Sequence, residues 1–290
     1  MNIIKELGAK CWALGCVRNG MTSIMESDNL DVYWVRMPED RWYADPFVLE
    51  VTDSEILLLV EDYAYAIRKG VISLLHIDRA SMEITSRKVL LELQTHLSFP
   101  AILRKDGHVY VYPESAERGK LDMYEYHQEK DELSFVQTIC DDVVWDSYIT
   151  EAFGAPFLFT AAKNDYQLDI YKWDDKRKRF IPDLVIPSEI KNSRMGGAVF
   201  EYQGKIYLPA QNCEKAYGGA LDIKEINYSN GRFELSTIKH LTSTHPNYQL
   251  GMHTLSEYKG VVVIDVHGYK YGWIGAMIEW IVGMKKRIKK

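Results

Sequence analysis

Acidic and other polar residues recur at two positions of an internal repeat, and their types could support chemistry. The first position carries Asp45, Ser98, Asp146, Arg194 and His253. The second position, about sixteen residues later, carries Glu61, Glu114, Gln211 and His267. Carboxyl groups that share a pocket push their pKa values apart, so one can act as an acid and another as a base. If the fold brings the two positions together, the pattern predicts a site for acid–base chemistry.

The same residues also have ordinary structural interpretations. Asp45 precedes a proline, where an Asp often caps a turn, and Asp146 can cap the start of a strand. Glu61 and Glu114 can form structural hydrogen bonds to neighbouring strands. His253 can be a hydrogen-bonded core histidine. These interpretations stay open beside the functional one.

The remaining candidates would bind a ligand. Arg194 can pair with one of the acids, or hold a phosphate or carboxylate through two hydrogen bonds. His253 and His267 lack the carboxylate spacing of a metal site, so neither a metal nor a cofactor is expected. Trp42 flanks the first position, and aromatic faces stack on sugar rings, although most strand aromatics simply pack. The other candidate binding residues are Gln211 and Ser98.

Five units of about fifty residues carry these positions, beginning near Asp45, Ser98, Asp146, Arg194 and Gly251. In each unit an apolar strand leads to a turn such as Lys-Asp-Gly or Gln-Gly, whose residues adopt positive φ at little cost. A second strand follows, and then a third and a fourth, such as LDMYEYH and LSFVQTI. Four strands at this period are the signature of a β-propeller blade.

We therefore predict an all-β fold, a five-bladed β-propeller with short N- and C-terminal helices. The expected parts are an N-terminal helical segment (1–30), the propeller (31–271) and an amphipathic C-terminal helix with a basic tail (272–290). A strand over 31–37 is expected to pair into the last blade and close the ring, which removes two sheet edges. A β-sandwich is the alternative, but it needs no such repeat. In a propeller both sets of residues should crowd one mouth of the central channel.

The composition excludes several classes of protein. Apolar residues make up 47% and charged residues 26% of the 290 residues, as in ordinary globular proteins. The net charge of −6 speaks against a nucleic-acid partner, which needs a basic face. The four cysteines have no CxxC spacing, so a zinc site or disulfide framework is not expected. The sequence also lacks GxSxG, Walker A and HExxH motifs.

The N-terminal segment, MNIIKELGAKCWALGCVRNG, does not resemble a signal peptide because charged residues interrupt its apolar stretch. We expect a short amphipathic helix here, with Ile3, Ile4, Leu7, Cys11 and Leu14 on one side.

At the other end, Trp273 to Met284 is apolar except for Glu279 and is followed by KKRIKK. This stretch is too short to cross a bilayer. It can lie in a membrane interface or pack on the propeller, and both alternatives stay open. We expect a cytoplasmic protein, with contact to the inner face of the membrane as one of these alternatives.

Several stretches resemble a known family: ADPFVLE, HLSFPAILRKDGHVYVYPES, SRMGGAVFEYQGKIYLPAQNCEKAYGGAL and GMHTL. Together they resemble the N-terminal domain of the glucosamine inositolphosphorylceramide transferases over about residues 42 to 267, and PAQNCEKAYGGAL is the most specific part. That family is similar to the five-bladed propellers of glycoside hydrolase families 43 and 32. The resemblance implies this fold and a sugar or glycan substrate.

The resemblance also implies roles for individual acids. In family 43 an Asp of the first blade is the general base, a second Asp orients it and a Glu is the general acid. Asp45 matches the base and Asp146 the second Asp. The acid has no match, since the fourth unit opens with Ser-Arg-Met around Arg194, where a Glu would be wanted. Glu114 and Glu61 are the candidate substitutes from other blades.

Two functions of different classes follow. The first is an enzyme of cell-surface polysaccharide or glycolipid biosynthesis that acts on a sugar, free or linked to a lipid or nucleotide. Transfer is favoured over hydrolysis, because a free cytoplasmic hydrolase would degrade precursors. The second is a non-catalytic glycan-binding or scaffolding propeller, which the missing Glu favours. A protein-interaction platform without sugar contact is a third, weaker hypothesis.

Overall fold

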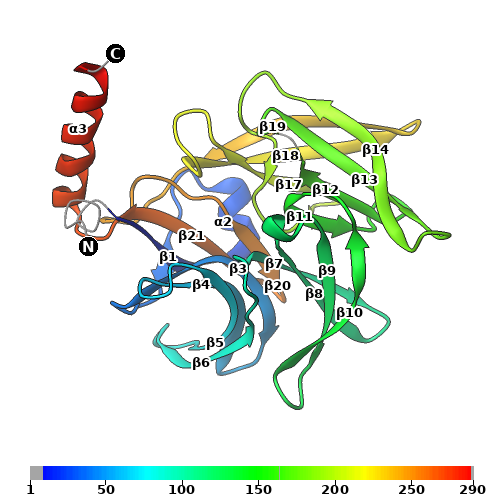
Figure 1. Cartoon of the computed structure of the whole chain (residues 1–290), viewed down its shortest axis with the longest axis horizontal. Helices are drawn as coiled ribbons and strands as arrows, with labels where there is room; N and C mark the ends of the chain where they lie inside the picture. Colours follow the sequence, from blue (N-terminus) through cyan, green and yellow to red (C-terminus); the bar gives the residue numbers. More distant parts are fainter. Residues whose placement is uncertain (1–8, 163, 289–290) are drawn as a thin grey trace.

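The computed structural model describes residues 9–162 and 164–288, without the side chains of 282–288, and shows five antiparallel sheets around a central axis (Figure 1). The predicted five-bladed propeller is confirmed. Blade 1 contains β3 (Arg41–Val51), β4 (Glu55–Ala64), β5 (Gly70–Asp78) and β6 (Ile84–Leu91). Blade 2 contains β7 (Ser98–Lys105), β8 (His108–Glu114), β9 (Leu121–His127) and β10 (Glu132–Cys140).

The next two blades follow in the same order from the axis outward. Blade 3 contains β11 (Trp145–Thr150), β12 (Phe157–Ala161), β13 (Gln167–Asp174) and β14 (Arg179–Pro187). Blade 4 has a divided inner strand, made by β15 (Arg194–Met195) and β16 (Phe200–Tyr202). Its other strands are β17 (Lys205–Asn212), β18 (Ala220–Ser229) and β19 (Arg232–Leu241).

Blade 5 is assembled from two parts of the chain that are far apart in sequence. Its order is β2-β1-β21-β20, with β20 (Leu255–Tyr258) innermost. β1 (Lys10–Val17) pairs along its whole length with β21 (Val261–Tyr269), and β2 (Val32–Trp34) pairs with β1. The segment 31–37 therefore joins the last blade as predicted, but only as its outermost strand. The ring is closed by β1.

The helix expected at the N-terminus is wrong over Lys10–Val17, where the structure has a strand that includes Cys11 and Leu14. Ile3, Ile4 and Leu7 lie outside the described residues. β1 is sandwiched between β2 and β21 and buried on both faces, which hides the alternation that marks an exposed strand. The two described α-helices are α2 (Gly20–Glu26) and α3 (Trp273–Ile288).

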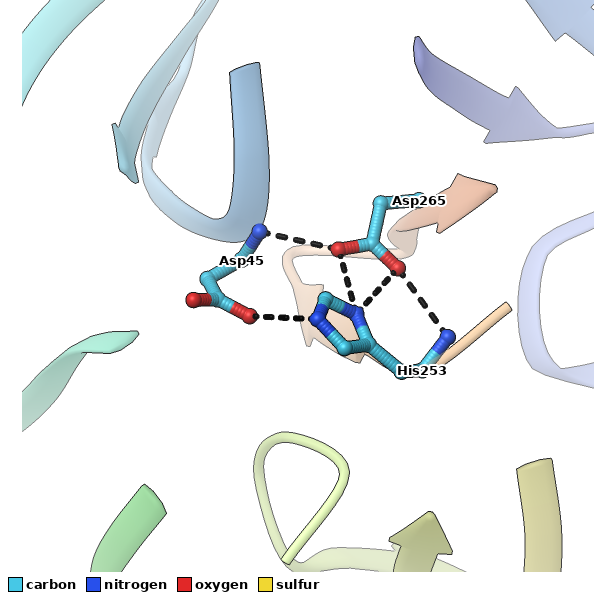
Figure 2. A group of neighbouring side chains, drawn as sticks. All are labelled: Asp45, His253 and Asp265. Carbon is cyan, nitrogen blue, oxygen red and sulfur yellow. Dashed lines mark hydrogen bonds and ion pairs between the residues drawn. The ribbon is translucent and has the colours of Figure 1, made fainter. Parts of the chain in front are cut away.

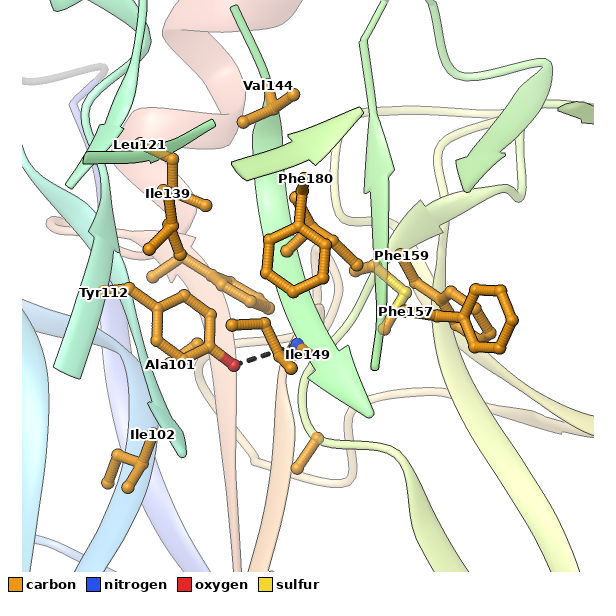
Figure 3. Close-up of a cluster of buried hydrophobic side chains, with 14 of the residues drawn as sticks. Ala101, Ile102, Tyr112, Leu121, Ile139, Val144, Ile149, Phe157, Phe159 and Phe180 are labelled. Atoms are coloured by element: carbon orange, nitrogen blue, oxygen red, sulfur yellow. Dashed lines mark hydrogen bonds between the residues drawn. The ribbon is translucent and has the colours of Figure 1, made fainter. Parts of the chain in front are cut away.

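The blades pack on one another through apolar and aromatic side chains. Tyr112 of blade 2 and Phe157 and Phe159 of blade 3 are fully buried (Figure 3). Tyr112 reaches blade 3, whereas Phe157 and Phe159 pack edge-on against Phe233 of blade 4. The buried Tyr112 hydroxyl accepts a hydrogen bond from the backbone N–H of Ile149 at 2.9 Å, so the polar end of the ring is satisfied as well. Such contacts fix the position of each blade relative to the next, and with it the side chains at the axis.

The innermost strands of the first three blades share a bulge near their start. The pairing register shifts between Ala44 and Phe47, between Ser98 and Ala101, and between Trp145 and Tyr148. The residues inside these bulges, Asp45, Phe99 and Asp146, have φ angles of 49°, 44° and 45°. Asp tolerates this left-handed conformation, whereas a bulky Phe adopts it only where the surroundings impose it.

Candidate active site at the propeller axis

The pairing register brings the two predicted positions together. Ala44 pairs with Glu61, Ser98 with Glu114, Arg194 with Gln211, and Gly251 with His267. These pairs collect polar side chains at one end of the propeller axis. We call this group the axial cluster: Asp45, Glu61, Glu114, Asp146, Arg194, Gln211, His253, Asp265 and His267.

Carboxylates of the axial cluster bind the bulges of neighbouring blades. The Asp45 N–H donates to Asp265 Oδ2 at 2.9 Å, and the Phe99 N–H donates to Asp45 Oδ2 at 3.0 Å. The Asp146 N–H donates to Glu114 Oε2 at 2.8 Å. Bulging has removed these N–H groups from their own ladders, so each needs another acceptor. The acids therefore have a structural role whatever else they do.

Asp45, His253 and Asp265 form one half of the cluster, which we call the histidine half (Figure 2). His253 Nδ1 lies 2.8 Å from Asp265 Oδ2, and His253 Nε2 lies 3.6 Å from Asp45 Oδ1. Burial alone would lower the pKa of His253, but the two carboxylates outweigh it and raise the pKa to about 9. Burial raises the pKa of Asp45 to about 7, against the pull of His253. Near neutral pH, the charged imidazolium of His253 thus faces an Asp45 carboxyl that is partly ionised.

Aromatic rings and a tight loop cover His253. Trp12 stacks on it with ring centroids 3.8 Å apart, and its centroid lies 4.4 Å from that of His267. Gly218 has φ 58°, and a Cβ there would lie 3.0 Å from His253 Cβ. The Gly218 carbonyl accepts a hydrogen bond from His267 Nε2 at 3.2 Å. The PAQNCEKAYGGAL stretch therefore needs glycine at position 218, because the loop packs directly on His253.

His267 itself stays neutral. Burial and the nearby His253 cation lower its pKa to about 4. With the proton on Nε2, its buried Nδ1 has no hydrogen-bond partner among the described residues. The Gln211 side-chain oxygen is likewise buried without a partner among them. Two buried acceptors at the axis are thus open to a donor from water or a ligand.

Glu114, Asp146, Arg194 and Gln211 form the other half, which we call the arginine half. Arg194 Nε and Gln211 Nε2 both donate to Asp146 Oδ2, the latter at 2.7 Å. Arg194 Nη2 lies 3.8 Å from Glu114 Oε2. Burial and the neighbouring Asp146 raise the pKa of Glu114 well above its ordinary value, and Arg194 offsets only part of this. Burial beside Asp146 therefore favours the protonated form of Glu114, which is the form that a general acid needs.

Glu61 belongs to neither half. Its Oε1 lies 3.2 Å from His96 Nε2. The Gly70 N–H donates to His96 Nδ1 at 3.0 Å, which places the ring proton on Nε2, pointing at Glu61. Burial raises the pKa of Glu61, but the His96 hydrogen bond acts against it. The His96 side chain thus favours the ionised form of Glu61, whereas the nearby Asp146 favours the protonated form of Glu114, so Glu61 is less suited than Glu114 to donate a proton.

A cavity of about 430 Å³ adjoins the histidine half. Its aromatic lining residues are Trp12, Trp42, Tyr65, Tyr248 and Tyr271, and Lys270 is also part of its wall. Trp12 belongs to both places, since its ring stacks on His253 and also lines the cavity. Trp42 stacks on Tyr63 with centroids 4.6 Å apart, so one of its faces is already covered. The cavity thus offers aromatic surface, and Trp12 is the lining residue that connects it to the histidine half.

The histidine half also has the composition of a metal site, because Asp45, His253 and Asp265 place one ligand atom each within 4.8 Å of one another. These atoms already bind one another and nearby groups: Asp265 Oδ1 accepts the Thr254 N–H at 2.9 Å. Asp45 Oδ1 accepts the Thr254 hydroxyl at 2.9 Å. A cation would have to displace the His253 proton and these bonds. The donors fit a charge-compensated imidazolium better than a metal centre.

The sequence analysis missed Asp265, Trp12 and His96. Asp265 stands alone in the apolar run VVVIDVHG, and a single acid inside a buried strand was a usable signal. Trp12 gave none, because its strand pairs with a segment near the other end of the chain. The hydrogen bonds of Asp146 go to the arginine half, while those of Asp45 go to Thr254, Phe99 and Asp265.

Comparison with protein families and curated proteins gives a consistent result. The family model described as "Glucosamine inositolphosphorylceramide transferase 1, N-terminal" matches residues 35–239. Glucosamine inositolphosphorylceramide transferase 1 of Oryza sativa subsp. japonica is 23% identical over 198 residues, and that of Arabidopsis thaliana is 27% identical over 148 residues. These alignments cover 63% and 48% of this chain but 26% and 19% of the relatives. The chain thus matches about a quarter or less of their length.

Solved structures with the same fold include glycoside hydrolases. A β-xylosidase superposes with a TM-score of 0.56 at 14% identity, covering 74% of this chain and 81% of the other. A family 43 β-xylosidase/α-arabinofuranosidase from a compost microbial metagenome gives 0.54 at 12% identity, covering 72% and 79%. A family 43 enzyme from Xanthomonas citri gives 0.53 at 12% identity, covering 79% and 88%. At these identities the likeness establishes the fold.

Proposed function

The chain belongs to the family of the N-terminal domain of glucosamine inositolphosphorylceramide transferases, and on that premise we propose that it is a sugar-active enzyme of cell-surface glycolipid or polysaccharide biosynthesis. The reaction is glycosyl transfer or glycoside hydrolysis at the axial cluster, with Asp45 as the base and Glu114 as the acid. One observation carries the proposal. Two buried carboxyls have different neighbours: the His253 imidazolium lowers the pKa of Asp45 against burial, whereas Asp146 adds to the effect of burial on the pKa of Glu114 and Arg194 offsets only part of it.

The base is the carboxyl whose charged form is better supported. Asp45 accepts hydrogen bonds from the Thr254 hydroxyl and the Phe99 N–H, and it faces the His253 imidazolium. These contacts favour the ionised form against burial, so a useful fraction is ionised near pH 7. Asp45 takes the proton of the attacking hydroxyl or water as that oxygen bonds to the sugar carbon.

The acid completes the exchange at the leaving group. Glu114 gives its proton to the glycosidic oxygen as the bond from that oxygen to the sugar carbon breaks. Burial and Asp146 keep the Glu114 pKa high, and Arg194 and Gln211 hold Asp146 in place. Asp146 is then a positioning residue for the acid. In the arrangement that the resemblance implied, it would have oriented the base.

The cavity that shares Trp12 with the histidine half is the proposed binding place for part of the substrate, with the reacting sugar carbon at the axial cluster. Trp42 and Tyr65 offer ring faces to a sugar. Lys270 Nζ lies 3.8 Å from the centre of the Tyr65 ring and forms no ion pair with the described residues. A free ammonium at this wall suits the phosphate of a lipid- or nucleotide-linked sugar. Transfer from such a donor is favoured over hydrolysis.

A ligand panel tests the proposal. Nucleotide sugars, short polyprenyl-phosphate sugars and oligosaccharides are screened by thermal shift against the wild type and Asp45→Asn, and each hit is then assayed for turnover. A ligand at a hundred times its Kd stabilises by about 2.7 kcal/mol, which is readily seen. We expect a phosphate-linked sugar to bind both proteins and to be turned over only by the wild type. Equal turnover by Asp45→Asn would refute the mechanism.

Arg194 favours a second candidate, a non-catalytic glycan-binding propeller. It stands where the resemblance called for the acidic Glu, and its guanidinium also lies 5.4 Å from the centre of the Tyr217 ring. A cation beside an aromatic ring binds acidic sugars without chemistry. This function predicts that oligosaccharides bind, that Asp45→Asn weakens their binding, and that no ligand of the panel is turned over.

A further inference from the structure

α3 carries an apolar face that the described residues of the propeller leave uncovered. Trp273 is 74% exposed, Trp280 63% and Met277 47%. At about 100° per residue, these three residues and Ile281 fall within an arc of roughly 100° on one side of the helix. In Figure 1 the helix stands at the edge of the molecule beyond β21. Large exposed apolar surface of this kind marks a contact site.

The opposite side of the helix holds it to the propeller. Gly275 lies so close to Tyr269 that a Cβ there would come within 2.6 Å of the Tyr269 Cβ. The Tyr269 hydroxyl donates to Glu279, whose other oxygen lies 3.8 Å from Lys10 Nζ. The acid of the helix is thus turned toward the blade. The apolar face therefore points away from the blade.

The charge after this face has the sign that an anionic surface attracts. The sequence places Lys285, Lys286 and Arg287 directly after the apolar stretch, followed by Lys289 and Lys290, in a chain of net charge −6. Basic residues beside an amphipathic helix are drawn to anionic lipids, with about 1 kcal/mol for each cation near the surface. Tryptophan side chains are also favoured at the headgroup level of a bilayer. Among the described helices, none is long and apolar enough to cross a membrane.

We propose that the apolar face of α3 is a docking surface for an anionic bilayer, in which the helix lies parallel to the membrane. The helix begins six residues after His267, so the docked helix holds the axial end of the propeller beside the lipid. Lys270 and Tyr271 of the cavity wall lie in the connection between them. Anionic lipid is richest in the cytoplasmic leaflet, so the protein would work at the inner face of the membrane. The docking is independent of the proposed catalytic function.

Flotation of the full chain with vesicles tests the docking. One set of vesicles is phosphatidylcholine alone, and in the other a third of the lipid is phosphatidylserine. We expect binding to the anionic vesicles and at least about tenfold weaker binding to the neutral ones. The double variant Trp273→Ser/Trp280→Ser should bind anionic vesicles at least about tenfold more weakly. Lys285→Glu/Lys286→Glu should lose a similar factor and should not respond to added salt as the wild type does.

A matched control separates docking from general exposure of apolar surface. Phe135 is 58% exposed on the outer strand β10 of blade 2, and Phe135→Ser should leave vesicle binding unchanged. The Trp and Phe variants should melt as the wild type does, because Trp273, Trp280 and Phe135 are exposed. No flotation with anionic vesicles would overturn the proposal, and so would full binding by the double Trp variant. A dimer in light scattering that the Trp substitutions dissolve would assign the face to a second copy instead.

Discussion

Each half of the axial cluster combines two carboxyl groups with one cationic side chain, but the cation differs between the halves. The histidine half places His253 between Asp45 and Asp265, and the arginine half places Arg194 beside Asp146 and Glu114. An imidazolium can lose its proton within the physiological range, whereas a guanidinium cannot. The histidine half can therefore change its charge with pH, while the arginine half keeps a fixed one.

In the proposed mechanism, the two halves have different tasks. A base must be ionised and an acid protonated in the same site at the same pH. Asp45, with a pKa of about 7, is partly ionised near neutral pH as a base requires, and its neighbouring cation, His253, can itself lose a proton. Glu114 meets the requirement of an acid beside Asp146, whose charge Arg194 balances permanently. The difference between the histidine half and the arginine half can be tested by substitutions, of which the first has the largest expected effect.

Arg194→Met should destabilise the protein by about 4 kcal/mol, because it leaves Asp146 without its cation in a buried place. His253→Gln should cost less, since Asp45 can take up a proton when its cation is lost. Urea denaturation at pH 7 measures both. Arg194→Lys, which keeps the charge, should recover part of the loss. Equal losses for Arg194→Met and His253→Gln would remove the contrast between the halves.

Asp45→Asn should lower turnover of the substrate about a hundredfold, the ordinary contribution of a general base. Asn accepts the positive φ of this position, so the bulge should survive. Its single side-chain oxygen cannot accept from both the Thr254 hydroxyl and the Phe99 N–H, so the melting temperature should fall. Steady-state kinetics on the ligand found in the panel measures the effect. Glu114→Gln is the matched change in the other half and should lose a similar factor. If Asp45→Asn and Glu114→Gln both kept the wild-type kcat, the role of the axial cluster would be purely structural.

Stability should fall by about 3 kcal/mol as the pH rises from 6.5 to above 9, because of His253. Its pKa is about 9 in the folded protein and 6.5 in the unfolded chain, so the folded state binds more protons in this window. The contribution is complete below pH 6.5 and is lost above pH 9. Urea denaturation across this range measures it. His253→Gln should flatten the profile, and Arg194→Lys should leave its slope unchanged.

Trp12→Leu should have the smallest effect, a loss of about 1 kcal/mol from the stack on His253. Because the ring also favours the charged imidazolium, the pH at which stability falls should move slightly lower. Chemical denaturation at two pH values measures both changes. Trp42→Leu, whose ring stacks on Tyr63 instead, should leave this pH dependence alone. A shift as large for Trp42→Leu would mean that the stack on His253 is not its cause.

Much of the fold was predictable because the blades repeat locally. The spacing of about sixteen residues between Asp45 and Glu61, or Ser98 and Glu114, reflects hairpins whose strands are adjacent in sequence. β1 escaped prediction because its partner β21 lies at the far end of the chain, and no local pattern records such a pairing. The sequence did not decide between Glu114 and Glu61 as the acid for a related reason. The pKa of Glu114 is raised by its burial at the axis and by Asp146 of the next blade, and no local sequence pattern records either.

The closure of the ring by β1 also sets when the site comes into being during synthesis. Blades 1 to 4 are built from strands that follow one another, so they can form as the chain leaves the ribosome. β1 is made first yet must wait for β21, and Trp12 reaches His253 only when these strands pair. Long-range pairing of this kind is slow. The growing chain therefore has no complete axial cluster, and the site is assembled in the last step of folding.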